Sequence, residues 1–285
     1  FKIGVYQTYY KKHLSSVGLK DSDMLVIATV ARSGTHYMML LLANYIKYFD
    51  SEGQGVNPSQ MNELFPNNWH IAYMNYHNIP FGPFYTEKPI YPKKSIRLLN
   101  VKEVTRSHSV FQKIFWKKSN ILHLYRNPLD YSVSLFNYKH KKNTSKNSLV
   151  SSPADVLAIK FDNYVKMYKS YIKAAQSGRY RVFRLSYEEL ITNPGFYLDA
   201  VLRWLGLDPE PQGVDFAVNM SSIKKTQESE KKGAVVNPTA HHLVGSFISS
   251  GQIGQWRKYY DHNEFKKWEK KFADHGVDLS AFTLD

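Results

Sequence analysis

The chain has 285 residues, of which 43% are hydrophobic, enough to bury the core of one large domain. Its formal net charge of +14 implies an anionic partner, such as a nucleotide, a sulfated product, nucleic acid or a membrane surface. The absence of cysteine excludes a disulfide framework, a cysteine-ligated zinc site and a cysteine nucleophile. The absence of cysteine also favours a reducing compartment, and we expect a cytoplasmic location. These residues contain no run of 18 apolar positions, so we expect no transmembrane helix among them.

The first predicted element is a buried strand over Met24–Val30, an apolar and β-branched run. A helix is predicted from Thr35 onward. The turn between them, residues 31–35, carries one cation, Arg32, among small residues, so backbone N–H groups and a helix N-terminus would face the same point. This pattern predicts an anion-binding loop. It differs from the ATP-binding loop, in which a lysine follows the glycine, because here the cation precedes Gly34.

Residues 50–94 combine glycine, proline and many aromatic residues without a clean period. A segment of this kind predicts a long loop, and its aromatic content argues against disorder. We expect most of the rings to pack on the core and two or three to line a substrate pocket.

Residues 100–115 are predicted to form a short strand followed by a helix. Arg106 and His108 lie two positions apart, so on an extended backbone both side chains emerge on the same face. A histidine beside an arginine at the carboxyl end of a strand lies where active sites of α/β proteins assemble.

Residues 120–140 repeat the plan of the first unit, with a strand over Ile121–Tyr125 followed by Arg126 and a helix. Pro128 suits the first helical turn, where its missing N–H group is not needed. Ser134 would lie about two turns into the helix. The repetition predicts a second group of phosphate ligands beside the first loop.

The rest of the chain predicts further α/β elements. These are a helix over 152–178, a strand over 181–185, a helix over 194–206, a mobile polar loop over 224–237 and a final helix over 263–273. We therefore expect a single α/β domain over residues 1–285, with a central parallel sheet flanked by helices.

Three of these motifs resemble those of the sulfotransferases that use 3'-phosphoadenosine-5'-phosphosulfate (PAPS). The family loop Pro-Lys-Ser-Gly-Thr-Thr-Trp is similar to residues 31–37, with arginine replacing lysine as in carbohydrate-modifying members. The family Lys-Thr-His resembles Arg106-Ser107-His108. The family Arg-Asn-Pro-Lys-Asp, with a serine eight residues after the arginine, is matched by residues 126–130 and Ser134.

Three later segments extend the resemblance, which covers roughly residues 24 to 275. Residues 187–190, Tyr-Glu-Glu-Leu, are similar to the family Tyr-Glu-Asp-Leu, and residues 221–223 resemble the Thr-Ser-Phe that follows. The last family element, Arg-Lys-Gly-x-x-Gly-Asp-Trp, corresponds to residues 249–256. This segment keeps both glycines and the tryptophan, but it has Ser249 and Ser250 in place of the two cations.

The resemblance implies a P-loop-like phosphosulfate-binding loop and sulfuryl transfer from PAPS without a metal. It implies that His108 is the general base, that Arg32 stabilises charge on the leaving phosphate and that Arg106 stabilises the sulfuryl oxygens. Imidazole, whose ordinary pKa is near 6.5, suits a base at neutral pH. The residues that would bind PAPS or its product 3',5'-phosphoadenosine (PAP) are Arg32, Ser33, Gly34, Thr35, His36, Tyr37, Arg126, Ser134, Tyr187, Ser222, Ser249, Ser250 and Gly251.

Three functions stay open at this point. The first is transfer to a hydroxyl or amine of a small molecule, which the aromatic loop favours. The second is sulfation of a glycan or lipid sugar, for which Arg32 and the basic charge are pointers. The third is a nucleotide kinase-like P-loop protein or a nucleic-acid binder, which leaves the spacing of Arg126 and Ser134 unexplained. The first implies a small-molecule acceptor as partner, no nucleic acid and no stable membrane insertion; the sequence does not predict an oligomeric state.

Overall fold

The structure, a computed structural model, describes residues 18–49, 54–65, 94–111, 116–141, 150–234 and 251–282, together with Ser15 and Lys113. Its centre is a sheet of four parallel strands in the order β2-β1-β3-β4. The strands are β1 (Met24–Thr29), β2 (Glu103–Ser107), β3 (Asn120–Tyr125) and β4 (Arg181–Ser186). Ile27 in β1 lies opposite Arg106 in β2 and Leu122 in β3. The expected parallel sheet is confirmed; the single domain over residues 1–285 stays a prediction.

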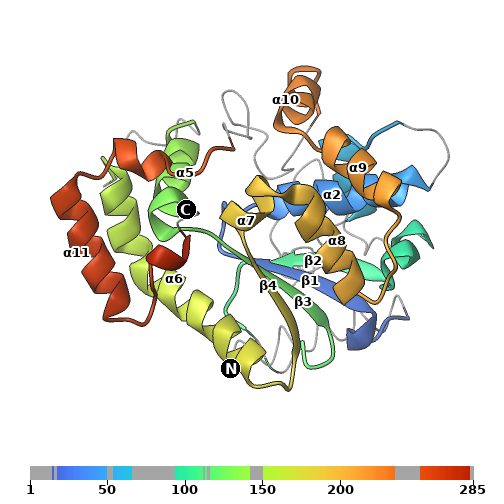
Figure 1. The fold of residues 1–285 in the computed structure, drawn as a ribbon, viewed down its shortest axis with the longest axis horizontal. Coiled ribbons are helices and arrows are strands. Elements are labelled where there is room, and N and C mark those ends of the chain that lie inside the picture. The colour runs from blue at the N-terminus through green and yellow to red at the C-terminus, as the bar shows by residue number, and fades with distance from the viewer. Residues whose placement is uncertain are drawn as a thin grey trace.

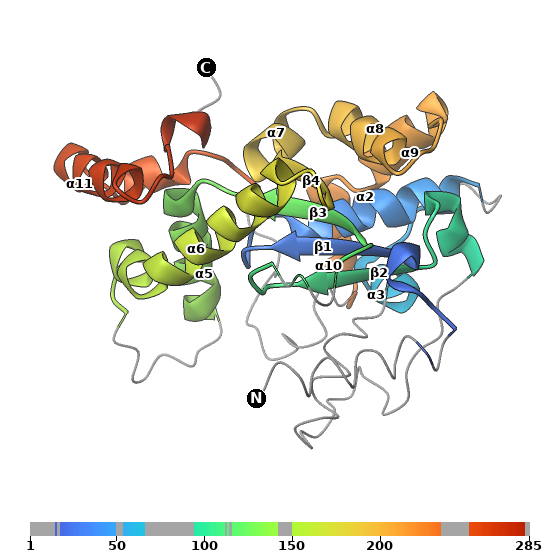
Figure 2. The same cartoon turned by 90° about the horizontal axis from the view of Figure 1, so that it is seen from below.

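Helices cover both faces of the sheet, so the molecule has three layers (Figures 1 and 2). One face packs against α2 (Thr35–Tyr48), α3 (Pro58–Leu64), α8 (Pro194–Trp204) and α9 (Pro211–Met220). The other packs against α5 (Pro128–Lys141), α6 (Pro153–Gln176) and α11 (His262–Ala273). Alternate residues of β1 enter the two cores, Leu25 and Ile27 the first and Val26 the second. This alternation explains why the strand is apolar throughout.

The remaining elements are short. They are the helices α7 (Tyr187–Thr192) and α10 (Ile223–Lys231), and the 3₁₀ helices η1 (Asp21–Asp23), η2 (Lys94–Leu99), η5 (Gln255–Lys258) and η6 (Ser280–Phe282). Among the described residues, no helix is long and apolar enough to cross a bilayer.

Local sequence signals set the ends of the longest helix, α6. The Ser152 side chain accepts from the N–H of Asp155, whose carboxylate in turn accepts from the N–H of Ser152. Pro153 occupies the first helical position. At the other end, Gly178 adopts a left-handed conformation with φ of 64°. The helix therefore begins and ends within two residues of the predicted bounds.

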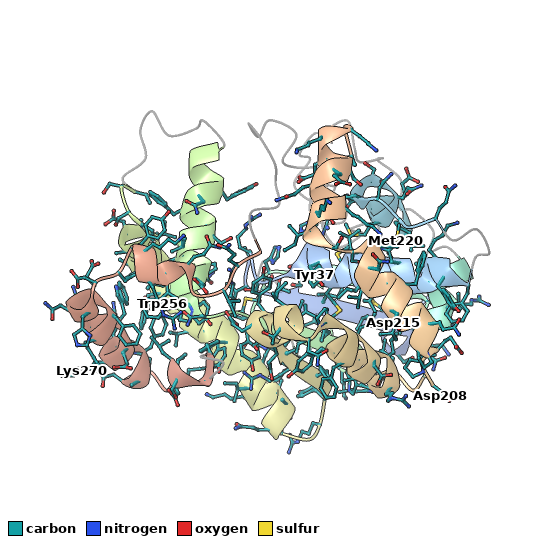
Figure 3. All side chains as sticks on the ribbon, turned by 45° about the horizontal axis from the view of Figure 1, so that its top comes forward. Tyr37, Asp208, Asp215, Met220, Trp256 and Lys270 are labelled. Carbon is teal, nitrogen blue, oxygen red and sulfur yellow. The ribbon has the colours of Figure 1, made fainter. Side chains whose placement is uncertain are left out.

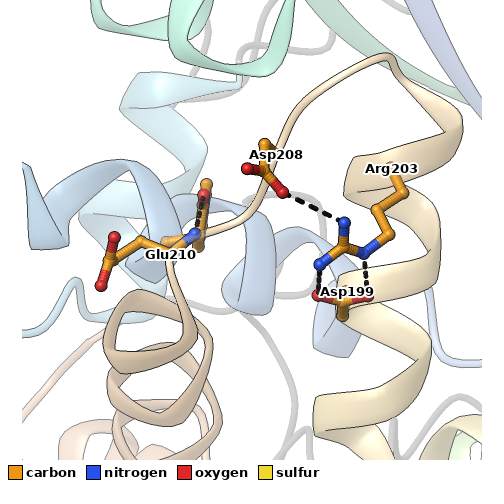
Figure 4. A network of polar contacts seen from close by, with 5 residues as sticks. Asp199, Arg203, Asp208 and Glu210 are labelled. Atoms are coloured by element: carbon orange, nitrogen blue, oxygen red, sulfur yellow. Dashed lines mark hydrogen bonds and ion pairs between the residues drawn. The ribbon is translucent and has the colours of Figure 1, made fainter.

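A polar network lies at the connection between α8 and α9 (Figure 4). Arg203 binds Asp199 at 2.7 Å and Asp208 at 3.1 Å, and all three side chains are partly or largely exposed. Exposed ion pairs of this kind contribute little stability. The backbone N–H of Glu210 donates to the Tyr45 hydroxyl at 3.2 Å, which links the start of α9 to α2.

The structure corrects three expectations. Part of the long loop predicted over residues 50–94 is helical, because Asn57 caps α3 and Pro58 occupies its first position. Residues 224–231, predicted to belong to a mobile loop, lie in α10. Lysine, glutamine and glutamate are good helix formers, and the buried Thr226 anchors a helix that is polar after its first residue, Ile223. The helix predicted after β2 is also wrong, because the described residues between 108 and 119 contain none.

Side chains of α6 explain the absence of that helix. The Ser170 hydroxyl accepts from the N–H of Phe111 at 3.0 Å, and the Tyr171 hydroxyl donates to the carbonyl of Ser109 at 3.0 Å. These contacts take backbone groups that a helix would pair internally. The expected pocket-lining rings of residues 66–93 lie outside the described residues.

Candidate active site

A cavity of about 210 Å³ lies at the carboxyl edge of the sheet. Each strand is followed within three residues by a side chain that lines it: Arg32 after β1, His108 after β2, Arg126 after β3 and Tyr187 after β4. The other lining residues are Ala31, Gly34, Thr35, His36, Tyr37, Ser134, Leu135, Tyr138, Ile191, Ser221, Ile223, Thr226 and Gly251. Parallel strands end at the same edge, so the topology gathers residues that are far apart in the sequence.

The turn between β1 and α2 forms one wall of the cavity. Arg32 and Gly34 both have left-handed backbones, with φ of 70° and 90°. Gly34 is the N-cap of α2 and has no side chain that could accept from the first N–H groups of the helix. Those donors and the positive end of the helix dipole lie among the lining residues, which is an arrangement suited to an anion.

Two arginines occupy the same cavity. Arg32 donates from Nε to the Ser134 hydroxyl at 3.3 Å, and its guanidinium lies 4.9 Å from the ring centre of Tyr138. Arg126 lies 4.2 Å from the ring centre of Tyr187. Burial and the neighbouring Arg126 lower the pKa of Arg32 to about 10, so Arg32 is still cationic at neutral pH. An anion between them would offset their mutual repulsion.

Arg126 also joins two loops. Its Nη1 donates to the Arg32 carbonyl at 3.2 Å and its Nη2 donates to the Gln252 carbonyl at 3.2 Å. The Tyr187 hydroxyl donates to the neighbouring carbonyl of Gly251 at 3.1 Å. Arg126, which was predicted to bind phosphate, therefore also holds these two loops together, and we call this set of contacts the clamp.

The Arg-Asn-Pro-Leu-Asp motif continues this clamp. The Asn127 side chain accepts from the N–H groups of Leu129 and Asp130 and so caps α5. The Asp130 carboxylate accepts from the N–H of Gly254 at 2.6 Å and of Trp256 at 2.9 Å. Trp256, labelled in Figure 3, lies on the side of the molecule that carries α5 and α6. Asp130 thus holds the glycine-bearing segment 251–256 against the cavity.

His108 is an exposed side chain directly after β2. Its Nδ1 lies 2.9 Å from the carbonyl oxygen of Thr29 and 3.0 Å from the Thr29 hydroxyl. A carbonyl only accepts, so Nδ1 carries the proton and donates. In the neutral ring, Nε2 then holds the lone pair. The Thr29 hydroxyl also lies 2.7 Å from the Thr35 hydroxyl, which connects the histidine to the loop.

Arg106 lies one layer behind the cavity wall. Its side chain is buried, and its Nη1 contacts Nε2 of His36 at 3.3 Å and the Met39 sulfur at 3.8 Å. His36 lines the cavity, whereas Arg106 does not. Burial and then the charge of Arg106 hold the pKa of His36 well below its ordinary value.

A family model described as "Sulfotransferase domain" matches residues 22–277, nearly the whole chain. The chain belongs to this sulfotransferase family. The expectation drawn from the motifs is therefore confirmed at the level of the family.

Curated members of the family are distant relatives. A 3-beta-hydroxysteroid sulfotransferase of Cavia porcellus is 21% identical over 177 residues, which are 59% of this chain and 59% of that protein. Sulfotransferase 2B1 of Rattus norvegicus is 20% identical over 293 residues, covering 100% of this chain and 80% of that protein. The match therefore spans about three fifths of the guinea-pig protein, but most of the rat one.

Solved structures share the fold. Retinol dehydratase in complex with androsterone and inactive cofactor PAP is similar at a TM-score of 0.65 and 16% identity, covering 94% of this chain and 84% of that one. Mouse sulfotransferase SULT7A1 complexed with PAP has a TM-score of 0.56 and 15% identity, covering 93% and 88%. At these identities the likeness concerns the fold.

Most of the residues singled out in the sequence meet at the cavity. Ten line it: Arg32, Gly34, Thr35, His36, Tyr37, His108, Arg126, Ser134, Tyr187 and Gly251. Three described ones do not: Arg106, the buried Ser33, and Ser222, which is the N-cap of α10 between two lining residues. Ser249 and Ser250 lie outside the described residues.

Sequence reasoning missed several residues of this site. Tyr138 stacks on Arg32 one helical turn beyond Ser134, and that spacing is a signal that could have found it. Thr29, the last residue of β1, is a fully buried polar residue in an otherwise apolar strand. Ser221 lies in the segment that resembles Thr-Ser-Phe and lines the cavity, although only its neighbour Ser222 was predicted to bind the nucleotide. Thr226 lines the cavity from α10, and no local pattern points to it.

Proposed function

We propose that this chain is an enzyme that transfers a sulfuryl group from PAPS to a hydroxyl or amine of a small-molecule acceptor. The observation that carries the proposal is the position of His108. Its Nδ1–H is held by the Thr29 carbonyl, and the ring lines the same cavity as Arg32 and Arg126. A base and two cations at one anion-binding loop match what sulfuryl transfer requires.

A buried donor without a partner supports nucleotide binding at this cavity. Arg126 lines the cavity, and within the described part of the chain its Nε is buried and has no hydrogen-bond partner. A buried donor without a partner is costly, and a phosphate oxygen would satisfy it. The structural relatives that were crystallised with PAP share this fold, which is consistent with the same ligand.

Bound PAPS supplies the sulfuryl group, whose bond to the phosphate oxygen breaks as the acceptor oxygen or nitrogen bonds to sulfur. His108 accepts the acceptor's proton at Nε2, because Nδ1 is already protonated and donates to Thr29. Arg32 offsets the negative charge that grows on the leaving phosphate. Arg126 and the N-terminus of α2 hold the nucleotide phosphates.

The relatives favour a small alcohol as acceptor. One is named a 3-beta-hydroxysteroid sulfotransferase, and the structural neighbour was crystallised with androsterone. The proposal for this chain is the coarser one, a hydroxyl or amine on a small molecule.

The test is a transfer assay with ³⁵S-labelled PAPS and a panel of alcohols, phenols, amines and oligosaccharides. We expect labelled product from at least one small alcohol, phenol or amine, and none when PAPS is replaced by labelled inorganic sulfate. Arg126→Ala should lose most of this transfer, while Arg179→Ala, which removes an exposed cation before β4, should keep it. Label on oligosaccharides alone would contradict the acceptor class, and no transfer to any member would contradict the activity.

A further inference from the structure

We infer that His36 is a hydrogen-bond donor to the sulfuryl group and that Arg106 acts through it as a positioning residue. This inference rests on the proposed function and deepens it. It assigns a role to the position where the family loop has a second threonine and this chain has a histidine.

The contact between Arg106 and His36 fixes the chemistry of the imidazole. Nη1 of Arg106 lies 3.3 Å from Nε2 of His36, and a guanidinium can only donate. Nε2 must therefore accept, which requires a ring without a proton on that nitrogen. A neutral imidazole carries its single proton on Nδ1 in that case, so the ring of His36, which lines the cavity, has one N–H donor and no basic nitrogen.

The surroundings keep this ring neutral. Burial is the largest effect, and it holds the pKa of His36 well below its ordinary value. Arg106, Arg32 and His108 also disfavour a second proton. Arg106 itself is buried on β2, and its Nη1 also contacts the sulfur of Met39 in α2. These contacts hold the guanidinium behind the cavity wall that His36 forms.

The two histidines of the cavity therefore have opposite roles. His108 donates from Nδ1 to a carbonyl and keeps a lone pair on Nε2, whereas His36 accepts at Nε2 and keeps a proton on Nδ1. Only His108 can take the acceptor's proton. Both rings line the cavity, and the Thr29 hydroxyl lies 3.0 Å from Nδ1 of His108 and 2.7 Å from the hydroxyl of Thr35, the residue before His36, so the base is joined to the loop that carries His36. A neutral donor on that loop stabilises oxygens on which negative charge increases.

The first measurement is a long-range ¹H–¹⁵N spectrum of the full chain labelled with ¹⁵N-histidine, assigned with His36→Asn. We expect His36 to show the Nδ1–H form from pH 6 to 8.5, unchanged in Arg106→Lys, which keeps a donor. In Arg106→Met the ring should change tautomer or begin to titrate. An Nε2–H form in the wild type, or an unchanged spectrum in Arg106→Met, would overturn the role of Arg106.

The second measurement separates the sulfuryl end from the nucleotide. PAP lacks the sulfuryl group, so His36→Leu should leave the Kd for PAP within about twofold while kcat with PAPS falls about 10- to 100-fold, the usual worth of a charge-assisted hydrogen bond. His36→Asn, whose amide retains an N–H donor, should recover most of kcat. If His36→Leu has the same turnover as an active wild type, this inference alone is overturned. If the wild type itself shows no transfer, the proposed function is overturned.

Discussion

Replacing Gly34 by alanine should damage both the fold and nucleotide binding. The residue has φ of 90°, a conformation that costs an L side chain about 1–2 kcal/mol. The added Cβ would also lie 2.8 Å from Cδ2 of Tyr187, closer than real Cβ contacts allow. Overpacking of this kind costs about 1–3 kcal/mol. We therefore expect Gly34→Ala to lower the free energy of unfolding by about 2–5 kcal/mol.

The matched control is Gly233→Ala. Gly233 has nearly the same φ, 92°, but among the described residues other than its chain neighbours no heavy atom lies within 4 Å of the position that an added methyl group would take. It should therefore lose only the conformational term, about 1–2 kcal/mol. Urea denaturation followed by tryptophan fluorescence measures both variants against the wild type. If the two variants lose equal stability, the close approach of Tyr187 to Gly34 does not exist.

The same pair of variants tests the link to function. The added methyl group of Gly34→Ala would displace the ring of Tyr187. This ring stacks on Arg126 and lines the cavity. We expect calorimetry to show PAP affinity reduced at least about tenfold in Gly34→Ala, equivalent to 1.4 kcal/mol, and unchanged in Gly233→Ala. Unchanged affinity in Gly34→Ala would refute the placement of the nucleotide beside Tyr187.

Three further predictions concern single side chains. Arg126→Ala and Ser134→Ala should each weaken PAP binding, the arginine by about 1.5–3 kcal/mol, and calorimetry that finds both affinities unchanged would reject the assignment. Thr29→Val, which removes the hydroxyl that contacts His108, should lower kcat about tenfold, whereas Thr29→Ser, which keeps a hydroxyl, should have a kcat near that of the wild type. Equal kcat values for Thr29→Val and Thr29→Ser would show that the hydroxyl does not position the base. Burial raises the pKa of Glu188 to about 7, so its contribution to stability is greatest below pH 4.5 and is lost as the pH rises through 7. The wild type should therefore lose up to about 3 kcal/mol over that window, and Glu188→Gln should lose much less; parallel urea profiles for the two proteins would contradict this.

The strand-arginine-helix units were predictable because their signals are local. The apolar run of residues 24–30 gives the buried strand β1, and the small turn that follows gives the start of α2 at Thr35. Pro128 similarly marks the first residue of α5. Since each arginine follows a strand within three residues and the strands are parallel, the meeting of Arg32 and Arg126 at one edge followed from the topology.

Other features depend on contacts between distant parts of the chain. Arg126 donates to the carbonyl of Gln252, 126 positions away, and no local pattern encodes that clamp. Arg106 was expected to reach the sulfuryl oxygens, but its side chain ends at His36 because α2 packs over that face of β2. Helix α10 was missed because its polar residues show little apolar periodicity, and packing of Thr226 decides its position.

The central claim is that His108 is the base of a sulfuryl transfer, and His108→Asn tests it most directly. The asparagine amide can still donate to the Thr29 carbonyl, so the fold and the Kd for PAP should stay near those of the wild type. Turnover with PAPS and an alcohol acceptor should fall about 10² to 10⁴-fold. In the wild type the rate should increase with pH as the imidazole loses its proton, and this increase should be absent from the pH profile of the variant. Full turnover by His108→Asn, with the same pH profile, would show that the base is another group.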